Sequence, residues 1–267
     1  MRTPRLAGLG LGIAAAAVMA TAGCGADGGT PGSGTTSATP SAPSSSGAAD
    51  PAAASALSSA AATLGTTSFD ITITAGPGAK LTGAVDAPNN KGTADLHLTG
   101  TNADLTVKTL LVVQDLYVQI PGITKAGTWT HVDVSRLPEG ANTGLRPGQI
   151  DPARTQQLIT STADVHQTGA REYAGTVDLT KVAGITGVDK VTVDGLGVAA
   201  QNVPFTAGLD DQGRLSVLTL QIPAVNGKAA QPVEVLYTDY GSPVTADRPA
   251  PSEITEAPDS IYKSLGG

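Results

Sequence analysis

The sequence predicts an α+β domain, in which a strongly curved antiparallel sheet has helices covering its concave face. Short segments with apolar residues at every second position recur between residues 69 and 240, separated by turn residues such as Gly, Asn, Asp and Pro. This alternation is typical of antiparallel strands with one buried face. Two other segments, at Asp50 and Asp151, have an Asp followed by Pro, which is the usual start of a helix.

The first helix is expected over residues 51–64. Asp50 precedes it as a cap, Pro51 suits its first turn, and Gly65 ends it. An apolar stripe at helical spacing consists of Ala53, Leu57, Ala60, Ala61 and Leu64. A second helix is expected to begin at Asp151 and to carry Leu158 and Ile159.

The expected strands fall into two series. The first contains Phe69, Ile71 and Ile73, then residues 81–85, then Ala94, Leu96 and Leu98, then Leu105, Val107 and Thr109, then Leu116, Val118 and Ile120, and finally residues 129–134. The second covers residues 173–179, 190–193, 203–209, 215–222 and 233–240, with a tight hairpin turn at residues 210–213. No internal repeat accompanies them.

The first 23 residues are typical of a secretory signal. Arg2 and Arg5 provide positive charge, and residues 6–20 are apolar but short for a membrane span. Residues 21–24, Thr-Ala-Gly-Cys, look like a bacterial lipobox, although Thr21 replaces the usual aliphatic residue. In that motif the cysteine receives a diacylglyceryl group and becomes the first mature residue.

We therefore expect Cys24 to carry a lipid that anchors the chain to the outer face of a cell membrane. Cys24 is the only cysteine, so an internal disulfide is excluded, and two or more acyl chains anchor a protein stably where one does not. The alternative is an ordinary secretory signal in which Cys24 is incidental. Residues 24–50 then form a Gly-, Ser-, Thr- and Pro-rich tether, residues 51–246 the folded domain, and residues 247–267 a loosely ordered tail.

Charge argues against nucleic acid as a partner. The chain has 16 basic and 23 acidic residues, a net charge of −7, and removal of Arg2 and Arg5 with the signal changes this to −9. Such a balance also disfavours adhesion to anionic lipid head groups.

No motif indicates an enzyme, a metal or a cofactor. His131 lies two residues from Asp133, and Asp95 two residues from His97, so each pair is expected on one strand face. A metal or catalytic site needs a third convergent group, and we interpret both pairs as solvated polar faces. Residues 210–213 lack the spacing and distal Glu of a calcium loop.

The interior of the sheet is expected to be lined by small aliphatic residues. Aromatic residues make up only 3% of the chain, so few large side chains can fill a wide interior. Two alternatives follow: a solid core rich in small aliphatics, or a hollow domain that holds an apolar ligand.

Several segments resemble the LppX/LprG family of actinobacterial cell-envelope lipoproteins. Besides the lipobox and tether, they are Thr67-Ser-Phe-Asp-Ile-Thr-Ile, Asp115-Leu-Tyr-Val, Trp129-Thr-His-Val-Asp-Val, Tyr173-Ala-Gly-Thr-Val-Asp-Leu, Gly208-Leu-Asp-Asp-Gln-Gly-Arg-Leu and Leu236-Tyr-Thr-Asp-Tyr-Gly-Ser-Pro-Val. The resemblance covers nearly the whole domain. It implies a half-barrel similar to the lipoprotein carrier LolA, with an apolar cavity that holds acylated lipids or glycolipids for transport in the cell envelope.

The leading hypothesis is thus a non-enzymatic binding protein for an acylated lipid, a glycolipid or another elongated apolar molecule. An envelope transporter or another envelope protein would be its partner. The alternative is a solidly packed interaction or sensory module that binds another envelope protein. The ligand-contacting residues expected from the strand alternation are Leu105, Val107, Leu116, Val118, Leu218 and Leu220.

Overall fold

The structure, a computed structural model, describes residues 49–100, 104–122, 124–137, 145–146, 149–182, 188, 190–259 and 262. The expected signal, Cys24 and the tether up to residue 48 lie outside the described residues. By its internal contacts the chain divides into two compact units, Met1–Ser44 and Ser45–Gly267, and every described element belongs to the second.

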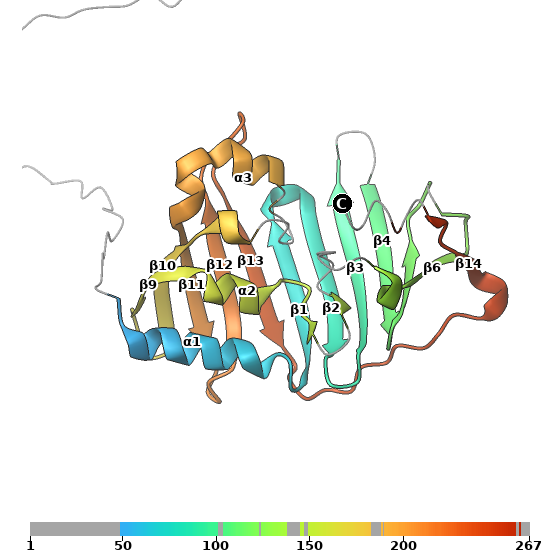
Figure 1. Ribbon diagram of the computed structural model, residues 1–267, viewed down its shortest axis with the longest axis horizontal. Helices are drawn as coiled ribbons and strands as arrows, with labels where there is room; N and C mark the ends of the chain where they lie inside the picture. Colours follow the sequence, from blue (N-terminus) through green and yellow to red (C-terminus); the bar gives the residue numbers. More distant parts are fainter. Residues whose placement is uncertain are drawn as a thin grey trace, which may run out of the picture. The chain divides into compact units, whose positions relative to one another are not determined.

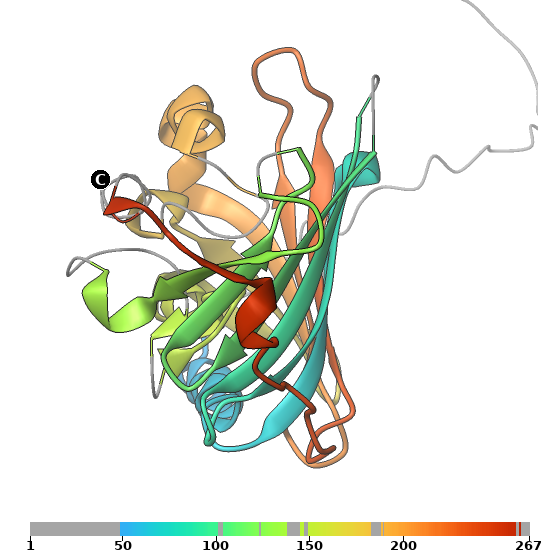
Figure 2. The same ribbon diagram turned by 90° about the vertical axis from the view of Figure 1, so that its right-hand side faces the viewer.

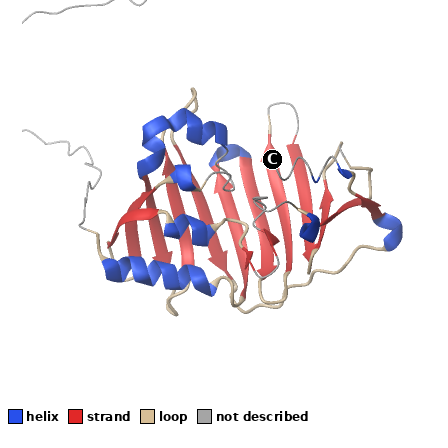
Figure 3. Cartoon of the chain, in the orientation of Figure 1, coloured by secondary structure: helices blue, strands red, loops and turns tan. Residues whose placement is uncertain are grey.

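A large, mostly antiparallel open sheet dominates the second unit (Figures 1 and 3). Among the described residues it has 12 strands, in the order β14-β6-β5-β4-β3-β2-β1-β13-β12-β11-β10-β9. They are β1 (Ser68–Ala75), β2 (Ala79–Asp86), β3 (Lys91–Thr99), β4 (Asp104–Val112), β5 (Asp115–Gln119), β6 (Trp129–Asp133), β9 (Thr162–Gln167), β10 (Glu172–Val177), β11 (Val203–Leu209), β12 (Leu215–Ile222), β13 (Gln231–Thr238) and β14 (Ile254–Glu256). A separate small sheet pairs β7 (Leu145–Arg146) with β8 (Gln149–Ile150). The predicted α+β class with an antiparallel sheet is confirmed.

The described α-helices are α1 (Pro51–Thr63), α2 (Thr155–Thr160) and α3 (Lys190–Leu196). In Figure 1 they lie in front of the part of the sheet formed by β9 to β13, with α1 running across the strand ends. The contacts agree, since α1 contacts α2, β9 and β12. No described helix has the length and apolar composition needed to cross a membrane.

The N-terminal helix forms as its sequence predicts. The Asp50 carboxylate accepts a hydrogen bond from the Ala52 backbone N–H at 2.8 Å, and Pro51 occupies the first turn. The helix ends when the Leu64 N–H donates to the Ala61 carbonyl. Its predicted apolar stripe is buried, so packing against the sheet stabilises a helix whose end is set by local capping.

The second predicted helix is shorter than expected. Asp151 does not start it directly, because α2 begins at Thr155. The Asp151 carboxylate instead accepts hydrogen bonds from the Thr155 hydroxyl at 3.1 Å and from the Gln156 N–H at 3.0 Å. Asp151 therefore still caps the helix, from four residues ahead of it.

One predicted strand is wrong, since residues 190–193 begin helix α3. Their two apolar residues, Val191 and Val193, alternate as in a strand. In the folded chain Val193 and Ala200 are buried while Val191 and Val198 are exposed. Val193 is the one buried side chain of α3. Two apolar residues in a four-residue segment are too few to distinguish strand alternation from helical spacing.

Four strands, β7, β8, β9 and β14, appear where none was expected. β7 and β8 are only two residues long, and β9 is an edge strand in which Val165 is the one buried side chain, so the alternation there is weak. The segment after residue 246, expected to be loosely ordered, contains the 3-10 helix η5 (Pro251–Glu253) and the strand β14. β14 pairs in parallel with β6 at the edge of the sheet, which is visible from the side in Figure 2.

The sheet has two chemically different faces. We call the face on which α1 packs the inner face, and Leu57 of α1 shares one core cluster with Phe69, Ile71 and Ile73 of β1. Residues between these on the strand, such as Thr72, point to the outer face, where threonines and charged residues predominate. The inner face therefore carries the core and the outer face is mainly polar.

Candidate functional site

The six residues predicted to contact a ligand all lie on the inner face. Directly paired residues of neighbouring strands point to the same side of a sheet. One such row contains Val107, Leu96, Leu81, Ile73, Val235 and Leu218. The next row contains Leu105, Leu98, Ala79, Ala75, Val233 and Leu220. Leu116 and Val118 share this face because Val118 pairs with Thr109, two residues from Val107.

Three of these six residues belong to the packed core. Leu218 and Leu220 of β12 are only 1% and 2% exposed. Leu116 of β5 is buried in the same core cluster, together with Val132 and Val134. A ligand could reach these side chains only by displacing their neighbours, so the structure gives them a packing role.

The other three, Leu105, Val107 and Val118, remain partly exposed. They lie next to further apolar residues on β2 and β3 that were not among the predicted ligand contacts. Leu81 and Leu96 are also partly exposed, and Leu98 is 36% exposed. We call this set the open apolar surface: Leu81, Leu96, Leu98, Leu105, Val107 and Val118. The strand alternation already placed Leu81, Leu96 and Leu98 on one face. It did not predict where the helices lie on that face.

A buried polar chain joins α2 to β13 on the inner face. The hydroxyls of Thr155 on α2 and Tyr237 on β13 lie 2.5 Å apart, and Thr155 also donates to Asp151. Burial raises the pKa of the Tyr237 phenol well above its usual value, so this group stays protonated and can donate. Burial also raises the pKa of Asp151. The hydrogen bonds that its carboxylate accepts lower this pKa, but burial outweighs them. Tyr237 pairs with Ile71 of β1, and β2 with its open apolar surface follows β1 in the sheet.

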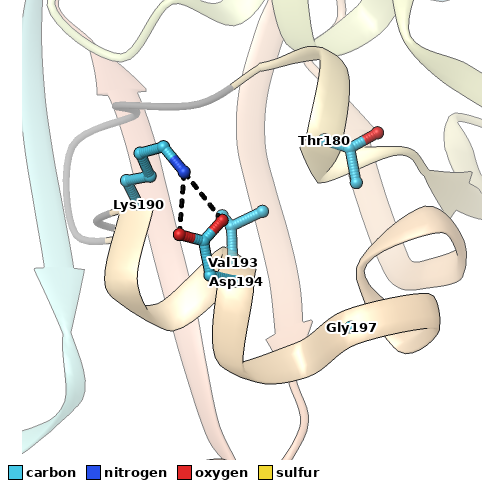
Figure 4. A pocket seen from close by; sticks show the side chains of 5 residues that line it. All are labelled: Thr180, Lys190, Val193, Asp194 and Gly197. Carbon is cyan, nitrogen blue, oxygen red and sulfur yellow. Dashed lines mark hydrogen bonds and ion pairs between the residues drawn. The ribbon is translucent and has the colours of Figure 1, made fainter.

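A pocket of about 370 Å³ lies beside α3, lined by Thr180, Lys190, Val193, Asp194 and Gly197 (Figure 4). Its two charged groups neutralise each other, since the Lys190 ammonium lies 2.7 Å from the Asp194 carboxylate. No net charge or convergent set of donors is left for a ligand there.

A second hollow, also of about 370 Å³, lies on the outer face over β1 to β3. Its polar lining includes Asp70, Thr72, Thr82, Thr93, Asp95 and Thr238. Burial, and then the nearby charge of Asp239, raise the pKa of Asp70. This hollow is open and polar, and it lacks the apolar lining that an acyl chain requires.

The histidine pairs considered in the sequence do not form metal sites. Asp133 caps the short helix η2 (Val134–Arg136) by accepting from the Ser135 N–H at 2.9 Å, and His97 contacts the Thr106 hydroxyl at 3.0 Å. His131 contacts Asp115 and Glu256 instead of Asp133. Within the described ranges no group of three or more His, Cys, Asp or Glu residues is arranged to hold a metal ion.

Neither a protein-family model nor a curated protein matches this chain. The open apolar surface combines apolar side chains with partial solvent access on four neighbouring strands, β2 to β5. Exposed contiguous apolar surface commonly marks a binding site. It is therefore the candidate functional site.

Proposed function

We propose that this chain is a membrane-anchored lipoprotein that binds an acylated lipid, a glycolipid or another elongated apolar molecule. The observation that carries the proposal is the open apolar surface, where six aliphatic side chains on four strands of one sheet face remain accessible. Neighbouring strands are about 4.8 Å apart, so four strands span roughly 15 Å. That is the width of several acyl chains side by side.

Covering this surface would supply part of the free energy of binding. Complete burial of a Leu or Val side chain is worth about 1.5–3 kcal/mol. Because these six side chains are already partly buried, covering them would contribute on the order of 5 kcal/mol. Contacts between the rest of a long acyl chain and the inner face would add to this.

We further infer that the sheet is a half-barrel of the LolA/LppX type, with helices covering its concave face. The 12-stranded antiparallel arrangement and the one-sided apolar lining support this inference. So does the resemblance of residues 67–73 and 236–244 to the LppX/LprG family. In this proposal the acyl chains lie on the inner face, the polar head remains near the helices, and the protein transfers its lipid to or from an envelope partner without a chemical step.

Lipidation of Cys24 supplies the anchor in this proposal. The segment from Gly25 to Asp50 has 26 residues, and no large apolar residue occurs among them. As a flexible chain it would reach roughly 30 Å. A carrier held at this distance could collect a lipid from the membrane surface.

The proposal is tested by purifying the full chain in mild detergent and analysing it by native mass spectrometry and solvent extraction. We expect a discrete mass increment that corresponds to a lipid with two or more acyl chains, present at about one molecule per protein. Repeated isolation without lipid, in preparations that also fail to bind a fluorescent diacyl phospholipid, would contradict it. Isolation with one stoichiometric protein partner in place of lipid would favour the interaction module.

A further inference from the structure

The outer face of the sheet has a small apolar cluster of its own, at the end formed by β4, β5 and β6. Leu110, Tyr117 and Ala246 are buried there, and Val112, Trp129 and Ile254 pack against them. Ala246 and Ile254 come from the C-terminal segment, whereas the others come from the sheet. We call residues 246–259 the C-terminal strap, because they cover this cluster and the edge of β6 (Figure 2).

Backbone contacts tie the strap to β6 over only a short distance. Strand β14 pairs with β6 in parallel, with Ile254 opposite Trp129 and Glu256 opposite His131. The Ala257 N–H donates to the His131 carbonyl at 2.9 Å. A three-residue parallel pairing at a sheet edge contributes little stability by itself, so side-chain contacts must hold the strap in place.

Beside the apolar packing of Ala246 and Ile254, the main polar side-chain contacts of the strap are at His131. Its Nδ1 lies 2.8 Å from a Glu256 carboxylate oxygen in the strap, and its Nε2 lies 2.8 Å from an Asp115 carboxylate oxygen on β5. Carboxylates only accept hydrogen bonds, and an imidazole can donate from both nitrogens only when it is protonated. A neutral His131 would direct a lone pair at one of the two carboxylates. The geometry therefore requires the imidazolium.

Charge balance around His131 leads to the same conclusion. The Arg248 guanidinium of the strap pairs with the second oxygen of Asp115. The group contains two carboxylates, Asp115 and Glu256, and two cations, Arg248 and protonated His131. Its net charge is therefore zero when His131 is protonated. Loss of that proton leaves one uncompensated negative charge between the strap and the sheet.

No other group near His131 supplies the positive charge that is lost when the imidazole gives up its proton. The Tyr117 ring stacks on the imidazole with ring centroids 5.1 Å apart, an arrangement that also favours a cation. Asp133 on β6 is engaged by Ser135, and Arg136 pairs with Asp259 at 3.1 Å. Asp133 and Asp259 are acidic and Arg136 has its own partner, so none of them offsets a neutral His131.

We propose that the C-terminal strap is a proton-controlled clasp, closed while both nitrogens of His131 donate to Asp115 and Glu256 and loosened when His131 becomes neutral. Loosening frees the β6 edge and exposes the apolar cluster around Trp129. This regulation is a property of the fold and does not depend on whether the inner face binds lipid.

The direction of the pH dependence follows from the environment of His131. Burial opposes the charged imidazole, but the hydrogen bonds to Glu256 and Asp115 and their negative charges outweigh it and raise the pKa of His131. A raised pKa in the folded chain stabilises the clasp below the ordinary histidine value of about 6.5. That stabilisation is lost as the pH rises through the raised pKa.

The chain provides its own reporter, since Trp129 is its only tryptophan and lies in the cluster that the strap covers. In the full chain, Trp129 emission is followed between pH 5 and pH 9, and the three histidines are titrated by NMR. We expect a red shift of Trp129 emission with the same midpoint as the His131 titration. Because a charged imidazole can itself quench tryptophan, exchange of the Ala257 amide, corrected for its intrinsic rate, is measured in parallel and should accelerate across the same range.

Two variants decide the outcome. Glu256→Gln, at an exposed position, should lower the midpoint by roughly 0.5–1 pH unit, and His131→Gln should abolish the transition. His97→Gln and His166→Gln are the matched controls and should leave it unchanged. Persistence of the transition in folded His131→Gln, an unshifted midpoint in Glu256→Gln, or an Ala257 amide that stays equally protected through the His131 titration would each overturn the proposal.

Discussion

The hydroxyl groups of Thr155 and Tyr237 lie 2.5 Å apart in the interior, where they join helix α2 to strand β13. Thr155 also donates to Asp151, so the Tyr237 hydroxyl is the donor in this contact. It joins α2 to the inner face of the sheet, where Leu158 and Ile159 of the same helix are also buried. This hydrogen bond is thus one of the buried contacts that hold the helix in position.

Tyr237→Phe should lower the free energy of unfolding by about 1–2 kcal/mol, because the variant leaves the Thr155 oxygen buried without a donor. Urea denaturation followed by circular dichroism measures the change. Tyr173→Phe is the matched control, since Tyr173 is also on the inner-face core but its hydroxyl makes no hydrogen bond within the described residues. Equal effects of the two substitutions would argue against a specific role of the Tyr237 hydroxyl.

Leu81→Gln should weaken lipid binding about tenfold, because it replaces an apolar side chain of the open apolar surface by an amide, and about 1.4 kcal/mol corresponds to a factor of ten. The measurement is the dissociation constant for a fluorescent diacyl phospholipid. Thr82→Gln is the control, since Thr82 is the next residue and points to the outer face with a similar degree of burial. If Thr82→Gln weakens binding as much, the ligand does not lie on the inner face.

Asp210→Ala should destabilise the turn between β11 and β12 by about 1–2 kcal/mol. The Asp210 carboxylate accepts from the N–H groups of Gln212 and Arg214, both at 2.9 Å, and pairs with the Arg214 guanidinium at 2.7 Å. Burial raises the pKa of Asp210, but these contacts outweigh it and leave that pKa lowered. The stabilisation is thus present above the usual aspartate pKa of about 4 and is lost as the pH falls.

The difference between wild type and Asp210→Ala should therefore shrink in denaturation series below about pH 4. Asp211→Ala is the control at the neighbouring position. Its partner is Arg171, and both side chains are largely exposed, so this ion pair is worth little. A constant difference from pH 7 to pH 2 would show that the charge of Asp210 is not what stabilises the turn.

Cys24→Ala should release the chain from the membrane and leave the folded domain intact, because the substitution removes the thiol that carries the proposed lipid. Membrane and soluble fractions are compared by immunoblotting, and ligand content by mass spectrometry. Thr21→Leu, which restores an aliphatic residue to the lipobox-like segment, should retain the chain in the membrane. Retention of Cys24→Ala would exclude this residue as the anchor.

Local sequence signals were sufficient for the elements whose limits are set locally. Asp50, Pro51 and Gly65 mark the limits of the first helix, and the hairpin at residues 210–213 follows from its Asp and Gly. Gly213 has a positive φ of 76°, which a glycine adopts without strain. The strand alternation also placed residues as far apart as Leu105 and Leu220 on one face, through the antiparallel register.

Tertiary contacts decided what the sequence did not reveal. In helix α3, Gly195 lies close to Asn226, since an added Cβ would be 2.4 Å from the Asn226 side chain, and this close approach exists only in the folded chain. Likewise, Leu218 and Val107 have the same alternation, yet one is buried under helices and the other is partly exposed. The sequence of a strand does not indicate which part of the sheet the helices cover. The position of the helices decides which residues belong to the core and which to the open apolar surface.

The strand order has a consequence for how the chain folds. β1 to β6 form one series of antiparallel neighbours and β9 to β13 another, and among the described strands the two series meet where β1 pairs with β13, more than 150 residues apart in sequence. During synthesis from the N-terminus, the first series is complete while β13 has not yet emerged. Until then β1, with the alternating sequence Ser-Phe-Asp-Ile-Thr-Ile-Thr-Ala, presents an unpaired edge. The late arrival of β13 is thus the step at which nascent chains are most exposed to self-association.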